Sequence, residues 1–263
     1  MLSRLEWYDE SAAELIRLRE TLPPELGPPV LERALLLLAV RHAGARVQEL
    51  PVSEPVKRLF AAEFFSFSAP PPAWAGHFRA EDLRYREMAR VATFRRFPAG
   101  QFQWETAGVP RSWLMKAEHP YSVLLRVVRE LGGFSPLLEM HVNALRKHRL
   151  ILLEREANLS YCRAAQALEQ QPAVRGLLMA SWMFCRTTGQ VTARLGWLRR
   201  VPEEAGAILF DLGEAPRNAG FLAGSAERRR LYAEGGYHPR MTCVLWPRRA
   251  LIEWARKRPE YGF

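Results

Sequence analysis

Arg175-Gly-Leu-Leu-Met-Ala-Ser-Trp-Met-Phe184 is the stretch of the chain that decides the fold class. Nearly every side chain in it is apolar, and we predict a buried strand over residues 174–184. A strand that is covered on both faces belongs in the middle of a sheet, with helices packed on the sheet. This stretch therefore favours an α/β fold.

Segments typical of strands and of helices alternate on both sides of this central strand. The expected strands cover residues 101–106, 112–116, 137–142, 150–153, 208–212 and 242–246, with 112–116 as the hairpin partner of 101–106. The expected helices cover residues 121–131, 161–168, 226–234 and 248–257, and Gly132 and Gly133 end the first of them. We predict a mixed-sheet α/β core over residues 97–263.

The residues before this core are predicted to be helical. Apolar residues at helical spacing indicate helices over residues 11–19, 30–42, 53–64 and 79–94. A proline-rich segment, residues 66–76, is the best linker candidate. We therefore expect a helical N-terminal region, residues 1–96, followed by the core.

The composition is that of an ordinary globular protein. Of the 263 residues, 48% are hydrophobic and 25% are charged. The longest apolar run, residues 34–40, is too short to span a bilayer, and the opening residues do not resemble a signal peptide. The three cysteines form no disulfide framework or metal knuckle. We expect a cytoplasmic protein with reduced thiols and no membrane partner.

The formal charge is +10, and 34 of the 38 basic residues are arginine, because lysine occurs only four times. Abundant arginine with scarce lysine is typical of a GC-rich, bacterial genome. Basic pairs and triplets are also scattered along the chain. The charge leaves two alternatives open: solvated surface arginines, which we favour, or a surface that binds nucleic acid or another anion.

Leu137-Leu-Glu-Met-His-Val142 brings together two polar residues that can carry chemistry. Side chains alternate along a strand, so Glu139 and His141 should share one face, about 7 Å apart. Such a pair can share a proton-transfer site or hold a metal, or it can simply face solvent. A metal would need another ligand, and no spacing selects one from His77, His119, His148 and His238. We therefore predict no metal.

Ser181 is the one hydroxyl in the buried central strand. Ligands of open α/β sheets bind near the carboxyl ends of strands, where Ser181 could hydrogen-bond a substrate. The alternative is that its hydroxyl bonds to the backbone. It is not a nucleophile elbow, because the pattern Gly-x-Ser-x-Gly is absent.

Ser225-Ala-Glu-Arg-Arg-Arg-Leu-Tyr-Ala-Glu-Gly-Gly-Tyr-His-Pro239, followed by Met241-Thr-Cys-Val-Leu-Trp246, predicts a basic helix, a glycine stop and a strand. The segment resembles the closing helix and strand of GCN5-related N-acyltransferases. The resemblance implies a GNAT-like fold and an acyl-CoA donor. It further implies that Tyr232 protonates the departing thiolate and that Arg228, Arg229 and Arg230 lie near the CoA phosphates. The alternative is that these are core residues and a solvated helix face.

The phosphate-binding turn of that family, Arg/Gln-x-x-Gly-x-Gly/Ala, is not found in the chain. The nearest phrase, Arg200-Val-Pro-Glu-Glu-Ala-Gly-Ala207, has two glutamates where the phosphates would lie. We expect an acyl-CoA-dependent N-acyltransferase that acts on a small amine or peptide, with Glu139 or His141 as general base and Ser181 in the binding site. The alternative is a non-catalytic module that binds nucleic acid or protein through its basic surface.

Overall fold

The structure is a computed structural model that describes residue 21 and residues 27–68, 83–143 and 152–263. The described chain divides into two compact units. One comprises the described residues up to Leu50 and those from Glu54 to Pro98, and the other comprises nearly all the rest. The helix expected over 11–19 and most of the linker expected over 66–76 lie outside the described residues.

The first unit is helical. Its main helices are α2 (Gly27–Arg46), α3 (Glu54–Ser68) and α4 (Leu83–Ala92), and the short η1 (Val47–Glu49) follows α2. The core centres on Phe60, whose ring lies 5.7 Å from Phe64 and 5.4 Å from Phe94 between centroids. Glu87 and Arg96 of the same unit form a buried ion pair. The helices expected over 30–42 and 53–64 are confirmed.

The second unit contains a mixed sheet, which confirms the predicted α/β class. Within this unit the strand order is β2-β3-β4-β6-β5. Its strands are β2 (Phe102–Ala107), β3 (Leu137–Val142), β4 (Gly176–Ser181), β5 (Ile208–Glu214) and β6 (Arg240–Pro247), and the short strand β1 (Phe97–Pro98) belongs to the first unit. Strands β3 and β4 run parallel, and the pairs β2–β3, β4–β6 and β5–β6 are antiparallel.

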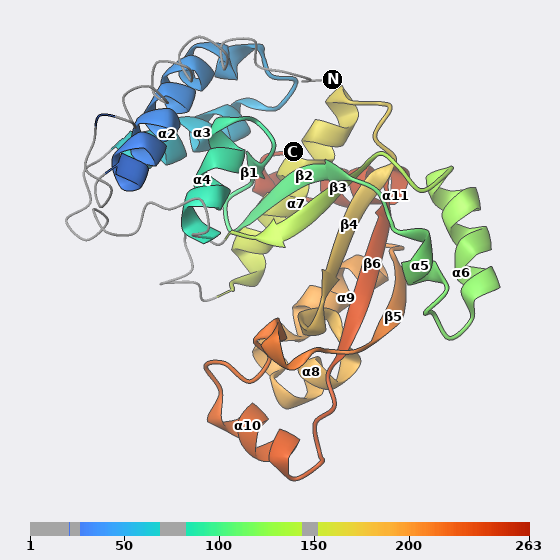
Figure 1. Cartoon of the computed structure of the whole chain (residues 1–263). Coiled ribbons are helices and arrows are strands. Elements are labelled where there is room, and N and C mark those ends of the chain that lie inside the picture. The colour runs from blue at the N-terminus through green and yellow to red at the C-terminus, as the bar shows by residue number, and fades with distance from the viewer. Residues whose placement is uncertain (1–20, 22–26, 69–82, 144–151) are drawn as a thin grey trace. The chain divides into compact units, whose positions relative to one another are not determined.

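Helices cover both faces of this sheet (Figure 1). On one face, α5 (Arg111–Leu114), α6 (Pro120–Arg126) and the π-helical turn η2 (Val127–Leu131) pack on Leu178 and Leu245. On the other, α7 (Glu154–Gln170) and α11 (Arg248–Arg256) enclose an aromatic cluster. The ring of Tyr161 lies 5.7 Å from Phe102, 5.5 Å from Trp246 and 6.1 Å from Trp254. One helix thereby contacts strands from both halves of the sheet.

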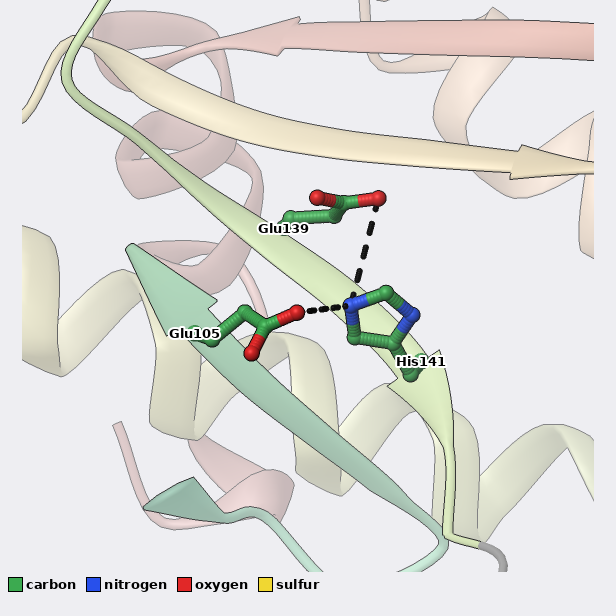
Figure 2. A group of neighbouring side chains, drawn as sticks. All are labelled: Glu105, Glu139 and His141. Carbon is green, nitrogen blue, oxygen red and sulfur yellow. Dashed lines mark hydrogen bonds and ion pairs between the residues drawn. The ribbon is translucent and has the colours of Figure 1, made fainter. Parts of the chain in front are cut away.

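The parallel strands β3 and β4 pair over a short length only. Each has six residues, but their register joins Leu138 to Leu177 and Glu139 to Leu178 and no other residues of these two described strands. Beyond these pairs the strands diverge toward their carboxyl ends (Figures 1 and 2). The backbones of β3 and β4 are therefore unpaired with each other beyond Glu139 and Leu178, and we call this divergence of the two strands the opening.

The strand expected over residues 112–116 is wrong, and the strand expected over 150–153 is not found in its described half. Residues 112–116 fall in and after helix α5, because Pro110 starts a turn in which its carbonyl accepts the amide of Trp113. Strand β2 pairs instead with β3, thirty residues further on. Residues 152 and 153, the described part of the strand expected over 150–153, precede α7, and Leu153 is its N-cap.

The central strand is shorter than expected, and the chain after it is helical. Strand β4 ends at Ser181, and the elements η4 (Trp182–Phe184), α8 (Arg186–Val191), η5 (Ala193–Leu195) and α9 (Gly196–Glu204) lead to β5. After β5 come η6 (Arg217–Ala219) and α10 (Ala226–Ala233), and after α11 comes η7 (Pro259–Tyr261). Within the described residues, no helix has the length and apolar character needed to cross a bilayer.

Candidate active site

Three ionisable side chains meet on one face of the sheet: Glu139 and His141 of β3 and Glu105 of β2. The predicted placement of Glu139 and His141 on one face is confirmed. Glu105 joins them because the antiparallel register sets it directly opposite Glu139, and Gln103 opposite His141. We call Glu105, Glu139 and His141 the carboxylate–histidine cluster.

The imidazole of His141 lies between the two carboxylates. Its Nε2 is 3.0 Å from Oε1 of Glu105 and 3.9 Å from Oε1 of Glu139 (Figure 2). The three side chains keep 31%, 25% and 25% of their surface accessible. The cluster is thus partly desolvated but open to a ligand. No described residue hydrogen-bonds Nδ1, which leaves that ring atom available.

Buried polar residues fix the strands that carry the cluster. Gln103, which has no accessible surface, donates its Nε2–H to Oδ1 of Asn143 at 2.7 Å. Asn143, equally buried, donates from its side-chain Nδ2 to the carbonyl of Gly100 at 3.3 Å, and its backbone N–H donates to the carbonyl of Gln101. These bonds hold the amino end of β2 against the carboxyl end of β3, so the cluster rests on a rigid ladder.

Glu139 extends toward the opening between β3 and β4 (Figure 2). Its charge also acts on Cys243 of β6. Burial and, secondarily, the Glu139 carboxylate raise the pKa of the Cys243 thiol. The Glu139 carboxylate thus interacts electrostatically with Cys243 of β6 as well as with His141 of β3.

Ser181 stands at the carboxyl end of β4, as predicted, but its side chain belongs to the opposite face of the sheet. Leu178 shares a face with Glu139 through the parallel register, and Ser181 is three residues further on. Its Oγ accepts the amide of Met183 at 3.2 Å and caps η4. The structure gives Ser181 the backbone bond that the sequence left as an alternative.

The arginines of α10 make bonds within the protein. Arg230 bridges Glu227 and Glu234, at 2.7 Å to each carboxylate, and these hydrogen bonds raise its pKa. Arg229 donates to the carbonyl of Leu222 at 3.1 Å. A CoA phosphate at this helix would have to compete with the two glutamates for Arg230.

Arg228 is almost fully buried. It donates to the carbonyls of Phe221 at 2.6 Å and Ala223 at 2.7 Å, and its guanidinium lies 5.1 Å from the ring centroid of Trp182. Burial lowers its pKa. The side chain therefore fastens the loop before α10 to η4.

Tyr232 packs its ring 5.3 Å from that of Phe221. Helix α10 lies at the opposite end of the second unit from β2 and β3 (Figure 1). The structure thus brings Glu139 and His141 together, and it places Tyr232 and the three arginines in a separate region. The phrase from Arg200 to Ala207 ends helix α9 and does not precede a helix, so it offers no helix N-terminus to phosphates.

Glu105 is the residue of the cluster that sequence analysis missed. It lies in the expected strand 101–106, with the same parity as Gln103, and could have been found only from the pairing of that strand. The expected hairpin with residues 112–116 concealed this pairing.

No protein-family model matches the chain, and no curated protein matches it. Among solved structures, an acyltransferase in complex with decanoyl-CoA and teicoplanin is similar, with a TM-score of 0.47, 15% sequence identity, and 89% of this chain and 75% of that chain covered. An acyltransferase in complex with CoA and 10C-teicoplanin has a TM-score of 0.48 at 15% identity, covering 92% of this chain and 78% of that chain. The similarity is one of fold alone.

Proposed function

We propose that the second unit transfers an acyl group from an acyl-CoA thioester to an amine, and that the reaction takes place at the opening between β3 and β4. The observation that carries this proposal is the divergence of the two parallel strands after Glu139 and Leu178, next to the carboxylate–histidine cluster. Ligands of α/β sheets bind at the carboxyl ends of strands.

The opening suits a donor that is extended and rich in amide groups. Strand edges bind extended chains through backbone hydrogen bonds. The carboxyl halves of β3 and β4 have no register with each other, so the strand edges that face one another can pair with a ligand instead. The pantetheine arm of CoA is such a chain, with its thioester at the end.

His141 is the general base of this proposal, and Glu105 orients it. If Nε2–H donates to Glu105 at 3.0 Å, the proton is fixed on Nε2, and Nδ1 presents a lone pair. An ammonium acceptor must lose a proton before its nitrogen can attack a carbonyl. Nδ1 takes that proton, and the carboxylates of Glu105 and Glu139 stabilise the imidazolium that forms.

In the transfer itself, the amine nitrogen bonds to the thioester carbon, and the C–S bond breaks to release the CoA thiolate. The thiolate needs a proton, and the donor predicted from the sequence is Tyr232. That role stays a prediction. Its test is Tyr232→Phe: a fall in turnover of about 10²–10⁴-fold supports it, and unchanged turnover refutes it.

The predicted contribution of Arg228, Arg229 and Arg230 to phosphate binding, and of Ser181 to the binding site, also stays a prediction. The alternative of a nucleic-acid-binding or protein-binding module stays open as well. It requires a dense basic surface, whereas several exposed arginines are paired with glutamates, among them Arg200, Arg230 and Arg249.

The first experiment is thermal unfolding of the full chain with CoA, with acetyl-CoA and with inorganic pyrophosphate as a control for simple anion binding, at low and high salt. A ligand at about 100 times its Kd adds about 2.7 kcal/mol, or several degrees in Tm. We expect a salt-resistant rise with both CoA compounds and little with pyrophosphate. No rise would overturn the proposal, and salt-sensitive binding of nucleic acid would favour the alternative.

Where the donor binds, His141→Asn tests the base. We expect kcat/KM to fall by about 10²–10⁴-fold while the Tm rise with acetyl-CoA remains. His238→Asn is the matched control, because His238 is exposed and hydrogen-bonds only to the carbonyl of Gly235 among the described residues.

A further inference from the structure

The geometry points to a second use of the carboxylate–histidine cluster: we propose that Glu105, Glu139 and His141 bind one divalent transition-metal ion of the Zn²⁺ class. This inference goes beyond the proposed function and requires no acyl donor. It rests on the arrangement of three ligand atoms.

The donor set is that of a transition-metal site. One imidazole nitrogen and two carboxylate oxygens lie within 4.8 Å of one another. Zn²⁺ binds such atoms at about 2.0–2.2 Å, so tetrahedral ligands are about 3.4 Å apart. The observed separations from Nε2, 3.0 Å to Glu105 and 3.9 Å to Glu139, lie on either side of that value. Small rotations of the two carboxylates would complete the site.

The strands hold these ligands in a suitable order. Glu139 and His141 are two residues apart on β3, and Glu105 lies directly opposite Glu139 on β2. All three thus project from neighbouring positions of one face, and the buried Gln103–Asn143 bond fixes the ladder beneath them. The site is therefore pre-organised, and binding would order only side chains.

The electrostatics of the cluster provide a second, independent argument. Glu105 and Glu139 are like charges directly opposite each other across two strands, which destabilises a sheet. Among the described residues, the ion-pair partner of Glu139 is His141. A dication bound between the carboxylates and Nε2 of His141 would remove this repulsion.

The choice of ion follows from the ligands. Imidazole suits Zn²⁺ and its neighbours in the first transition row, whereas Mg²⁺ and Ca²⁺ prefer oxygen alone. Three protein ligands leave a fourth position open to solvent, in agreement with the partial exposure of the side chains. A bound ion would also take the Nε2 lone pair and move the remaining proton to Nδ1, so it would block the proposed base.

The test is a competition between the full chain and a chromophoric Zn²⁺ chelator, in the absence of CoA compounds. We expect one Zn²⁺ equivalent per chain to bind more tightly than the rest. Glu105→Gln, Glu139→Gln and His141→Asn should each weaken that binding by at least about 100-fold, since the loss of even an outer hydrogen-bond partner weakens metal sites by 10–100-fold. Mg²⁺ in excess should not compete.

His238→Asn and Glu253→Gln are the controls, because they remove the same groups from exposed positions and should leave the affinity unchanged. The glutamine variants keep the shape of the side chain and relieve repulsion, and their Tm verifies that they are folded. Equal Zn²⁺ affinity in wild type and all three cluster variants would overturn the proposal, as would the absence of a distinct first equivalent. Zn²⁺ binding without any CoA-induced shift would leave this inference standing and refute the proposed function.

Discussion

At the scale of single residues, two buried tyrosine hydroxyls have opposite surroundings. Tyr237 Oη lies 3.0 Å from Oγ1 of Thr188, and both residues are fully buried. Tyr161 Oη is buried with no hydrogen-bond partner among the described residues. Burial raises the pKa of both phenols. One hydroxyl is therefore satisfied and the other is not.

Removing each hydroxyl should change stability in opposite directions. Tyr237→Phe removes the hydroxyl that bonds to Oγ1 of Thr188, while Oγ1 keeps its own bond to the carbonyl of Trp182, and we expect a loss of about 1 kcal/mol of the free energy of unfolding. Tyr161→Phe removes an unsatisfied group and should leave stability unchanged or raise it by about 1 kcal/mol. Urea unfolding of the two variants measures the difference. A larger loss in Tyr161→Phe than in Tyr237→Phe would contradict the prediction.

Glu105 can be tested through the tautomer of His141. Glu105→Gln keeps a hydrogen-bonding group at Nε2 but removes the charge that stabilises an imidazolium. If His141 is the base, we expect kcat/KM to fall by about 10–10³-fold, with KM for the acyl donor little changed.

Glu139→Gln is the comparison for this variant, because Glu139 is further from Nε2 than Glu105 is, at 3.9 Å against 3.0 Å. Its effect on kcat/KM should be smaller. Equal effects of the two variants would show that the orienting role of Glu105 is wrong and that the cluster acts only through its total charge.

At the scale of elements, strand β4 meets β6 at a position that allows no side chain. A Cβ at Gly176 would overlap the carbonyl oxygen of Trp246 and crowd the amide of Arg248. Because these are backbone atoms, of β6 and of the first residue of α11, they cannot move aside without disturbing the pairing of β4 with β6. We expect Gly176→Ala to lower the free energy of unfolding by at least about 2 kcal/mol.

The control for this prediction is Gly44→Ala, in the exposed surface of helix α2. A Cβ at Gly44 meets nothing within 4 Å, and alanine is the better helix former. This substitution should stabilise the protein by about 0.5–1 kcal/mol. Calorimetry of both variants compares the two glycines, and a stabilised Gly176→Ala would refute the proposed clash.

Sequence patterns predicted the elements whose signal is local. Strand β3 begins and ends at the predicted residues, and Gly132 ends the helix before it with a φ of 73°. Helices α8 and α9 were missed, because α8 has the polar, β-branched sequence Arg-Thr-Thr-Gly-Gln-Val and α9 contains Pro202. The pairing of β2 with β3 is non-local, and no short-range pattern contains it.

The candidate site divides in the same way. The shared face of Glu139 and His141 follows from the alternation of one strand, so the sequence predicts it. Glu105 joins the site through the register between two strands, and the bond that the amide of Met183 donates to Ser181 depends on where β4 ends. Properties of a single strand could be predicted, and properties of a strand pair or a strand end could not.

At the scale of the whole molecule, the buried thiols should make the free energy of unfolding depend on pH in the alkaline range. Burial raises the pKa of Cys162 to about 12, and burial also raises the pKa of Cys243. In the unfolded chain both thiols ionise from about pH 9. The unfolded state then binds fewer protons than the folded state, so stability falls as pH rises from about 9 toward 12.

Each thiol should contribute a slope of up to about 1.4 kcal/mol per pH unit in that window. Urea unfolding at a series of pH values measures the slope, and Cys243→Ser, whose hydroxyl does not titrate there, should reduce it. Below about pH 8 neither thiol should add any pH dependence. An unchanged slope in Cys243→Ser would exclude this thiol as a source.

The short register between β3 and β4 also has a mechanical consequence. Two residue pairs join the β2–β3 ladder to the β4–β6–β5 ladder, and we call this junction the seam. The ring of Tyr161 packs against Phe102 of β2 and Trp246 of β6, so it contacts both ladders on one face. Because only two residue pairs join the ladders, we expect each ladder to unfold locally without the other. Amide hydrogen exchange should therefore be fastest along the seam, beyond Glu139 and Leu178. A molecule bound to both strands at the seam would slow amide exchange in both ladders at the same time. The two ladders would then open together and not separately.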